Sequence, residues 1–492
     1  MNFLRPIETL TENQTQSGLN LVVKESVAAE GMITLTGGTF LVAMALHLGA
    51  SNFQIGLLAA LPILTNVFQV LSIWLVQKYN NRKAVTVLAS FLSRVPLFVI
   101  GIIPFLFSAG TGLQALILLL FFHYFFGSVA QASWGSWMKD LVPERILGQY
   151  FSHRTKVIQT LSVVFSLSVA FFVDYMKAHH SDQVTMMYFI MFLVGGIFGM
   201  SGVFFLSKVK EPKAEYVQQN MFLLFKKPLM DRNFRKLLIF NSSWAFALNL
   251  AIPFFVVFML KTIGLSMSYI IALTVVGQVS SIVSIKMWGR YTDRYSNKTI
   301  IRICAPVYII CILAMAFAAI PSSQASSLAI LIVINIFSGI STAGINLAIS
   351  NIAMKLAPRE DAMVYISARN MIVSFFTAVA PLLGGLMADF FASHQLAWNI
   401  EWANGGHSTV LHLINLQGWN FFFVIGGVLA MLSMRSLKAV KETGEVQKEE
   451  VVQYMQQRLK TRLRENAPVR VIRTYKPGTL STGLVRKMMA MF

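Results

Sequence analysis

Residues 184–207 read VTMMYFIMFLVGGIFGMSGVFFLS, a run of apolar and small residues without one charged side chain. A helix needs about 20 mainly apolar residues to cross the hydrocarbon core of a bilayer. The whole chain shares this composition, because 55% of its 492 residues are hydrophobic and only 13% are charged. Soluble domains carry nearly twice that share of charge, so the run predicts a transmembrane helix in a membrane protein.

Eleven further stretches have the same character. Strand-like alternation is absent from them, and a helix satisfies every backbone polar group within lipid, so twelve transmembrane helices are predicted. The first stretch follows a polar segment and lacks an early small-residue cleavage site, which indicates a retained helix and not a signal peptide. The other stretches lie at about 25–48, 52–77, 84–107, 113–138, 150–174, 235–260, 267–289, 299–320, 326–353, 363–389 and 415–437.

The net charge of +20 is distributed unevenly along the chain. Lys and Arg gather in the connections after the even-numbered helices and before the seventh, whereas the other connections hold only Lys177 and Lys261. The positive-inside rule therefore predicts that both termini lie in the cytoplasm. Since topology accounts for most of the basicity, no nucleic-acid surface is expected.

Signatures of enzymes and metal sites are not found in the sequence. Cys304 and Cys311 stand seven residues apart in one predicted helix, as core residues do, and the loop histidines match no zinc spacing. There is no phosphate-binding loop, nucleophile elbow or pair of catalytic acids. We therefore expect neither enzymatic activity nor a cofactor or metal.

When the sequence is shifted by 215 residues, several positions of the first half match identical residues in the second half. The matches are Gly49 with Gly264, Ser51 with Ser266, Lys83 with Lys298, Arg154 with Arg369, and Asp174 with Asp389. A single register across several loops predicts two parallel six-helix halves. The expected division is a cytoplasmic N-terminal segment 1–20, a first half 21–207, a linker 208–234, a second half 235–437 and a basic tail 438–492.

The segment GRYTDRYSNK at 289–298 resembles the loop motif of the major facilitator superfamily. The copy at the matching place in the first half is degenerate and keeps only Arg82 and Lys83. The resemblance covers about residues 20–437. It implies an all-α, polytopic membrane protein with twelve helices in two parallel halves, both termini inside.

Two other stretches are similar to a group of bacterial permeases of unassigned substrate, which implies a multi-pass protein of the bacterial inner membrane. They are LGASNFQIGLLAALP at 48–62, and WMKDLVP at 137–143 followed by GQYFSHR at 148–154.

In the superfamily such a loop motif belongs to a gate. Its Gly lets two helices approach closely, and its Asp meets a neighbouring helix end or Arg in a link that breaks when the halves rock. Arg154 and Arg369 are the candidate partners of Asp293 here. The full set of gating candidates is Arg82, Lys83, Arg154, Gly289, Asp293, Arg294, Lys298 and Arg369.

The resemblance implies that helices 1, 4, 7 and 10 line a central cavity, and polar groups deep in a span are functional candidates. Glu30 is read either as the coupling acid or as an interfacial carboxylate paired with Lys24. Arg94 is read as a structural partner of a carbonyl or carboxylate, or as an anion site. Each polar residue could equally form an interhelical hydrogen bond. The cavity candidates are Glu30, Asn66, Gln69, His123, Gln131, Trp134, Asn241, Trp244, Asn249, Gln278, Asn346 and Arg369.

These features favour a secondary active transporter, expected to be a monomer, that moves a small solute by alternating access with proton coupling as the preferred driving force. A lipid or amphiphile translocator, or an efflux permease, is the alternative, suggested by Phe- and Met-rich spans. A non-transporting sensor or scaffold acting through the tail is the second alternative. In that tail Val452, Met455, Leu459 and Leu463 share one helical face, which favours binding to anionic lipid or to a partner.

Overall fold

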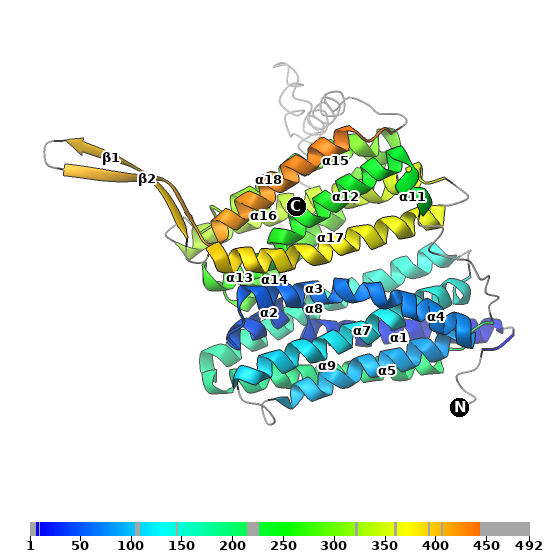
Figure 1. The fold of residues 1–492 in the computed structure, drawn as a ribbon. Helices are drawn as coiled ribbons and strands as arrows, with labels where there is room; N and C mark the ends of the chain where they lie inside the picture. The colour runs from blue at the N-terminus through cyan, green and yellow to red at the C-terminus, as the bar shows by residue number, and fades with distance from the viewer. Residues whose placement is uncertain are drawn as a thin grey trace, which may run out of the picture.

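The computed structural model describes residues 6–8, 10–103, 109–143, 146–213, 226–319, 323–358, 362–391, 394–404 and 407–442. Twelve helical spans in these ranges are long and apolar enough to cross a membrane, which confirms the predicted number. The spans form two layers, with the first half below and the second half above in Figure 1. The predicted tail helix lies outside the described residues.

The first half contains six spans, of which two are interrupted. Its elements are α1 (Glu12–Thr36), α2 (Gly38–His47), α3 (Asn52–Leu64), η2 (Thr65–Phe68), α4 (Gln69–Tyr79), α5 (Arg82–Gly101), α7 (Ala109–Leu141), α8 (Leu147–His179), η4 (Ser181–Gln183) and α9 (Val184–Lys208).

The second half repeats this arrangement, with one interrupted span. Its helices are α11 (Lys226–Met230), α12 (Arg232–Ala251), η5 (Ile252–Phe254), α13 (Phe255–Lys261), α14 (Met267–Arg294), α15 (Asn297–Met315), α16 (Gln324–Leu356), α17 (Ala362–Phe391) and α18 (Trp419–Lys438).

The first span begins earlier than predicted. A capping box at Thr11, in which its side chain accepts from the backbone of Gln14 and the Gln14 side chain bonds back, starts α1 at Glu12. The expected start near residue 25 therefore lies in the middle of the helix. The helix then stops at Gly37, and α2 begins at Gly38, whose φ of +55° is accessible chiefly to glycine.

Two more spans are interrupted by short 3-10 turns. Residues 65–68 form one such turn just after Pro62, and residues 252–254 form another around Pro253. Proline lacks a backbone N–H and clashes with the preceding turn, so the α-helix changes pitch there. Interrupted spans are frequent at the binding sites of transporters.

A β-hairpin follows α17 and departs from the expectation of an all-helical chain. β1 (Gln395–Asn404) pairs antiparallel with β2 (His407–Gln417), and Figure 1 shows the hairpin projecting away from the bundle. The sequence alternates here and contains Asn404-Gly405, a typical hairpin turn pair. The last span therefore starts at Trp419 and not near residue 415.

The repeat predicted at an offset of 215 is visible in the backbone. Gly49 and Gly264 both have positive φ, +80° and +73°, in the turn before a helix. Ser51 and Ser266 then stand at matching N-cap positions of α3 and α14. The two halves therefore enter their second spans through the same turn.

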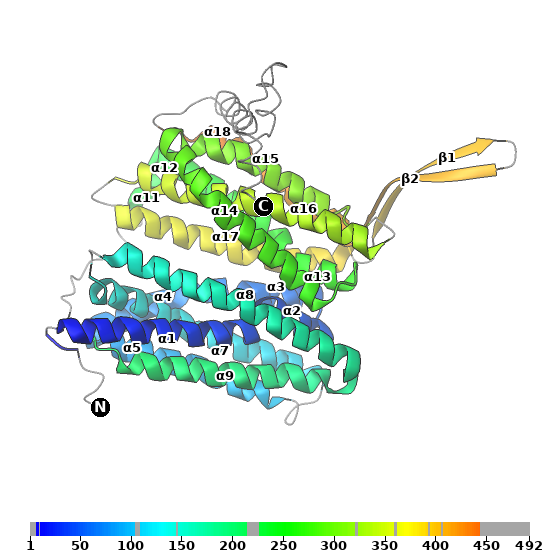
Figure 2. The same ribbon diagram turned by 180° about the vertical axis from the view of Figure 1, so that it is seen from behind.

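We define the basic face as the end of the bundle where α4 meets α5 and α14 meets α15, and the opposite face as the other end. Between the halves, α3 packs on α17, and α8 on α14 (Figures 1 and 2). One apolar cluster, which includes Met44, Ile55, Phe254 and Phe258, spans both halves toward the opposite face.

Toward the basic face each half has an apolar core of its own. Trp137 and Leu206 belong to a cluster made of first-half residues, and Phe234 and Tyr365 to a cluster made of second-half residues. The helix α4, the part of the second span nearest this face, packs on α5 and α7 of its own half. The apolar clusters of the described residues thus cross between the halves toward the opposite face and stay within one half toward the basic face.

Candidate functional site

A cavity of about 600 Å³ lies in the first half, and all of its lining residues belong to that half. The breaks in the first two spans border it, through Gly37, Gly38 and Pro62. Its charged lining residues are Glu25 from α1, Arg94 from α5 and Arg154 from α8. Charges inside a span are costly, so their convergence on one cavity marks the candidate site.

Arg94 lies about midway along α5, in space that a glycine provides. A Cβ at Gly199 on α9 would stand 2.7 Å from Cγ of Arg94 and 2.6 Å from Sδ of Met32. Among the described residues the Arg94 side chain makes no hydrogen bond, and its Nε is buried without a partner. The pairing expected for a purely structural arginine is thus not found in the described part of the chain.

Arg154 is held on two sides. Its Nε donates to Oγ of Ser26 at 2.6 Å, and its guanidinium lies over the ring of Trp134, 4.9 Å from the centroid. A cation over an indole face is attracted by the ring quadrupole. These contacts fix the plane of Arg154 at the edge of the cavity.

Glu25 is the acid of the cavity. Its Oε2 lies 3.3 Å from the Ser26 hydroxyl, and both Arg94 and Arg154 act on it electrostatically. No oxygen of Glu25 comes within ion-pair distance of a cation in the described residues. The cavity therefore contains two guanidinium groups and one carboxylate that are close together without direct pairing.

Polar candidates predicted from the sequence complete the lining. Asn66, His123, Gln131 and Trp134 all border the cavity. His123 is also tied to the backbone, because its Nδ1 lies 2.6 Å from the Ser93 carbonyl oxygen. That contact favours a structural role for the histidine over a proton relay.

The other candidates of the first half lie outside the lining. Glu30, the expected coupling residue, is on α1 but is not a lining residue of this cavity. Gln69 donates a hydrogen bond from Nε2 to Oδ1 of Asn66 at 3.2 Å and so orients a residue that lines the cavity.

None of the second-half candidates is among the residues that line this cavity. Asn241 and Trp244 are buried in the core of their own half, and Asn249 donates to the Ala245 carbonyl within its own helix at 2.8 Å. Gln278 and Asn346 are exposed. Arg369 donates to Oδ1 of the adjacent Asn370 at 3.0 Å, while its Nε is buried without a partner.

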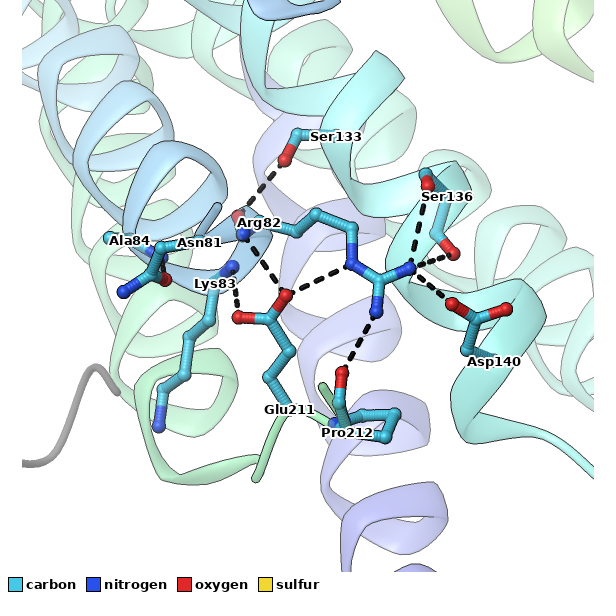
Figure 3. A network of polar contacts seen from close by, with 9 residues as sticks. All are labelled: Asn81, Arg82, Lys83, Ala84, Ser133, Ser136, Asp140, Glu211 and Pro212. Atoms are coloured by element: carbon cyan, nitrogen blue, oxygen red, sulfur yellow. Dashed lines mark hydrogen bonds and ion pairs between the residues drawn. The ribbon is translucent and has the colours of Figure 1, made fainter. Parts of the chain in front are cut away.

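Two of the gating candidates form a network at the basic face, drawn in Figure 3. Arg82 begins α5 and donates through Nε to Oε1 of Glu211 at 2.9 Å, while its Nη1 contacts Asp140. The backbone N–H groups of Arg82 and Lys83 each donate to Glu211 at 3.0 Å. Glu211 thus caps α5 from just beyond the end of α9, as an acid at a helix N-terminus does.

A matching network caps α15 in the second half. Glu442 lies just beyond the end of α18 and accepts from the backbone of Lys298 at 2.8 Å and from Nζ of Lys355 at 3.2 Å. Lys298 also donates through Nζ to the Val440 carbonyl at 2.8 Å. Burial raises the pKa of Glu442, but hydrogen bonds, the strongest from Ser296, outweigh burial and leave that pKa lowered.

Arg154 and Arg369 form no hydrogen bond or ion pair across the halves in the described residues. Arg154 and Arg369 contact their own halves, and a Cβ at Gly289 would meet open space, so the close helix approach expected there is absent from this conformation. Arg294 lies over the neighbouring Tyr295 ring at 5.5 Å. The side chain of Asp293 lies outside the described residues.

Two aspartates link the halves at the opposite face. Asp174, at the end of α8, accepts from the backbone N–H groups of Met267 and Ser268 at 2.9 and 2.8 Å. Asp389, at the end of α17, accepts from those of Asn52 and Phe53 at 3.1 and 3.0 Å. Each carboxylate therefore caps the first turn of a helix in the other half, and the two caps are related by the repeat.

The bundle has twelve spans in two repeated halves, which are joined at one face, and it contains a charged cavity. This architecture defines a multi-pass membrane protein of the transporter type. The chain belongs to the Major Facilitator Superfamily, whose family model matches residues 27–353 and again residues 237–477. This confirms the family and the fold that the loop motif implied.

Solved structures show the same fold at low sequence identity. A D-xylose–proton symporter matches with a TM-score of 0.62 and 14% identity, over 88% of this chain and 99% of its own. A mutant of the nucleoside transporter NupG matches with a TM-score of 0.61 and 15% identity, over 87% and 100%. A bacterial homologue of the iron transporter ferroportin, in an inward-facing state, matches with 0.58 and 12%, over 88% and 100%. No curated protein sequence matches the chain.

Proposed function

We propose that the protein is a secondary active transporter that moves a small solute by alternating access, with the first-half cavity as its substrate site. The observation that carries the proposal is the convergence of Glu25, Arg94 and Arg154 on a cavity of about 600 Å³ bordered by two interrupted spans. Sites of this size and mixed lining hold small molecules. We place the protein in the bacterial inner membrane as a monomer without enzymatic activity.

The conformation supports an orientation for the transport cycle. If the basic face is cytoplasmic, as the positive-inside rule predicts, the halves are joined on the outer side and separate on the inner side. That is the arrangement of a transporter open to the cytoplasm. The gate expected around Asp293 would then be broken, which agrees with the separate contacts of Arg154 and Arg369.

Glu25 replaces Glu30 as the proposed proton-coupling residue, because Glu25 lines the cavity beside two cations. Protonation removes its charge from the cavity and changes how strongly Arg94 and Arg154 attract a solute. Among the alternatives, a lipid translocator fits less well, because three charged side chains would face acyl chains.

The test is uptake into proteoliposomes with and without a pH gradient, across panels of metabolites and drugs. Solute movement that a pH gradient accelerates is expected for the unsubstituted protein, with that acceleration lost in Glu25→Gln. Glu30→Gln is the matched control on the same helix and should keep it. No movement of any solute would contradict the transport proposal, and unchanged pH dependence in Glu25→Gln would remove Glu25 as the coupling residue.

A further inference from the structure

We infer that the cavity binds an organic anion and that Arg94 holds its negatively charged group. The inference rests on the proposal that this cavity is the substrate site, and it adds the chemical class of the substrate and the residue that selects it.

The charge of the cavity is the first argument. Arg94 and Arg154 bring two positive charges, and Glu25 is the single acid in the lining. A buried charge is costly unless it is paired and hydrogen-bonded. An anion in the cavity would supply the missing negative charge. A cationic solute would increase the excess of positive charge, and a neutral solute would leave that excess unchanged.

The free donors of Arg94 are the second argument. The side chain makes no hydrogen bond in the described residues, and Nε is buried without a partner. A guanidinium presents its donors as a rigid planar fork that matches a carboxylate or phosphate with two parallel bonds. Arg154 already gives Nε to Ser26 and stacks on Trp134, so Arg94 is the arginine with its fork available.

Two more unpaired donors border the same space. Nε1 of Trp134 and the hydroxyl of Thr86 are buried without partners, and both residues line the cavity. Buried polar groups normally have a hydrogen-bond partner, and an indole N–H can only donate. These donors add to the preference of the cavity for a ligand that carries acceptor oxygens.

The remaining lining indicates an organic body and not a bare inorganic ion. Met32, Ile33 and Pro62 give apolar walls, and Tyr124 adds an aromatic ring. A cavity of about 600 Å³ has room for a small organic molecule of this kind. The expected ligand therefore has one anionic end at Arg94 and an apolar or aromatic remainder.

Glu25 would compete with this ligand. The groups that face it are Arg94 from α5, and Arg154 and Tyr150 from α8, while α7 brings His123 against Arg94. An ionised Glu25 offsets one of the two guanidinium charges, and a protonated Glu25 leaves both to the ligand. Anion binding should therefore become tighter as the pH falls and Glu25 is protonated, and Glu25→Gln should remove most of that pH dependence.

The experiment is ligand binding to the purified full-length protein in detergent, by thermal unfolding and calorimetry. The probes are matched series such as benzoate, phenyl phosphate, benzamide and benzamidinium, together with aliphatic carboxylates, sulfonates and organic phosphates. Stabilisation by anions, and not by their neutral or cationic counterparts, is expected. The carboxylate and phosphate members show which anionic group the site prefers.

Variants then assign the residue. Arg94→Gln should weaken anion binding at least about thirtyfold, since removing one partner of a buried charge pair typically has an effect of that size or larger. Arg94→Lys keeps the charge without the fork and should bind with intermediate strength, and it serves if Arg94→Gln does not fold. Arg435→Gln removes the same charge from an exposed site on α18 and should bind as the unsubstituted protein does.

The outcomes separate the two proposals. If no anion stabilises the protein more than its neutral counterpart, or if Arg94→Gln and Arg94→Lys both bind as Arg435→Gln does, the inference is wrong. Uptake of neutral or cationic solutes in proteoliposomes would refute the anion inference and leave transport intact. Anion binding at Arg94 without movement of any solute would support the inference and refute the transport proposal.

Discussion

Neutralising Asp174 and Asp389 together should open the opposite face. Each carboxylate caps the first turn of a helix in the other half with two backbone hydrogen bonds, so both caps must break when the halves separate there. The Asp174→Asn and Asp389→Asn substitutions keep the shape and one acceptor oxygen but remove the charge that the helix N-termini attract. The conformation joined at this face therefore loses stability relative to the one open there.

The magnitude follows from the exposure of the two sites. Asp389 is exposed and Asp174 is half-buried. A charge at a helix terminus contributes about 0.3–1 kcal/mol when exposed and up to ~2 kcal/mol when partly buried. A combined loss of ~2 kcal/mol would shift the equilibrium between the two conformations by about thirtyfold.

The assay is a spin-label distance between the halves at the opposite face. Gln114→Cys on α7 and Ala325→Cys on α16 are exposed positions for the labels, and the native Cys304 and Cys311 are buried. The double aspartate variant should show a longer-distance population that is minor or missing in the unsubstituted protein. Each single variant should show a smaller shift in the same direction.

The control is Asp182→Asn. Asp182 is an exposed carboxylate at the same face, but it caps no helix of the other half in the described residues. Its distance distribution should match that of the unsubstituted protein. If the double aspartate variant also matches it, the two caps do not hold the halves together and the reasoning is refuted.

Two further predictions concern packing and pH. Gly199→Leu should displace Arg94 and abolish anion binding, because even a Cβ at this position would crowd Cγ of Arg94. Gly202→Ala, whose Cβ would have 3.5 Å to its nearest neighbour, should bind normally in the same thermal-unfolding assay. A Gly199→Leu protein that folds and binds as Gly202→Ala does would contradict the prediction. Glu442 has a lowered pKa in the folded protein, so it stabilises at neutral pH and that contribution disappears as the pH falls below the ordinary glutamate value of 4.5. Glu442→Gln should therefore lower the thermal midpoint at neutral pH and approach the unsubstituted protein in acid, and a difference that grew in acid would contradict this.

The sequence was sufficient for the number of spans, the repeat and the family, because each depends on long apolar runs or on motifs within loops. The correspondence of Asp174 with Asp389 was also visible, as a match in the repeat register. The sequence did not show that each aspartate caps a helix in the other half, because this depends on how the halves pack.

The cavity was harder to predict because depth in the membrane depends on where a helix begins. With the first helix expected near residue 25, Glu30 stood a turn inside and Glu25 stood at the interface. The capping box at Thr11 starts the helix at Glu12, so Glu25 lies about 20 Å along it. The Gly37-Gly38 pair and Pro62 were the sequence signals of the interrupted spans that border the cavity.

The networks at the basic face have a consequence for the history of the duplicated halves. By the repeat register, Arg82 and Asp140 of the first half correspond to Asn297 and Lys355 of the second, so the cation that meets the capping glutamate has moved from one helix to the next. A change copied from one half into the other would place two cations, or none, around a glutamate. The halves have therefore diverged within these self-contained networks while remaining interchangeable at the aspartate caps. A chain built from two first halves would keep both caps at the opposite face and an intact capping network in each half.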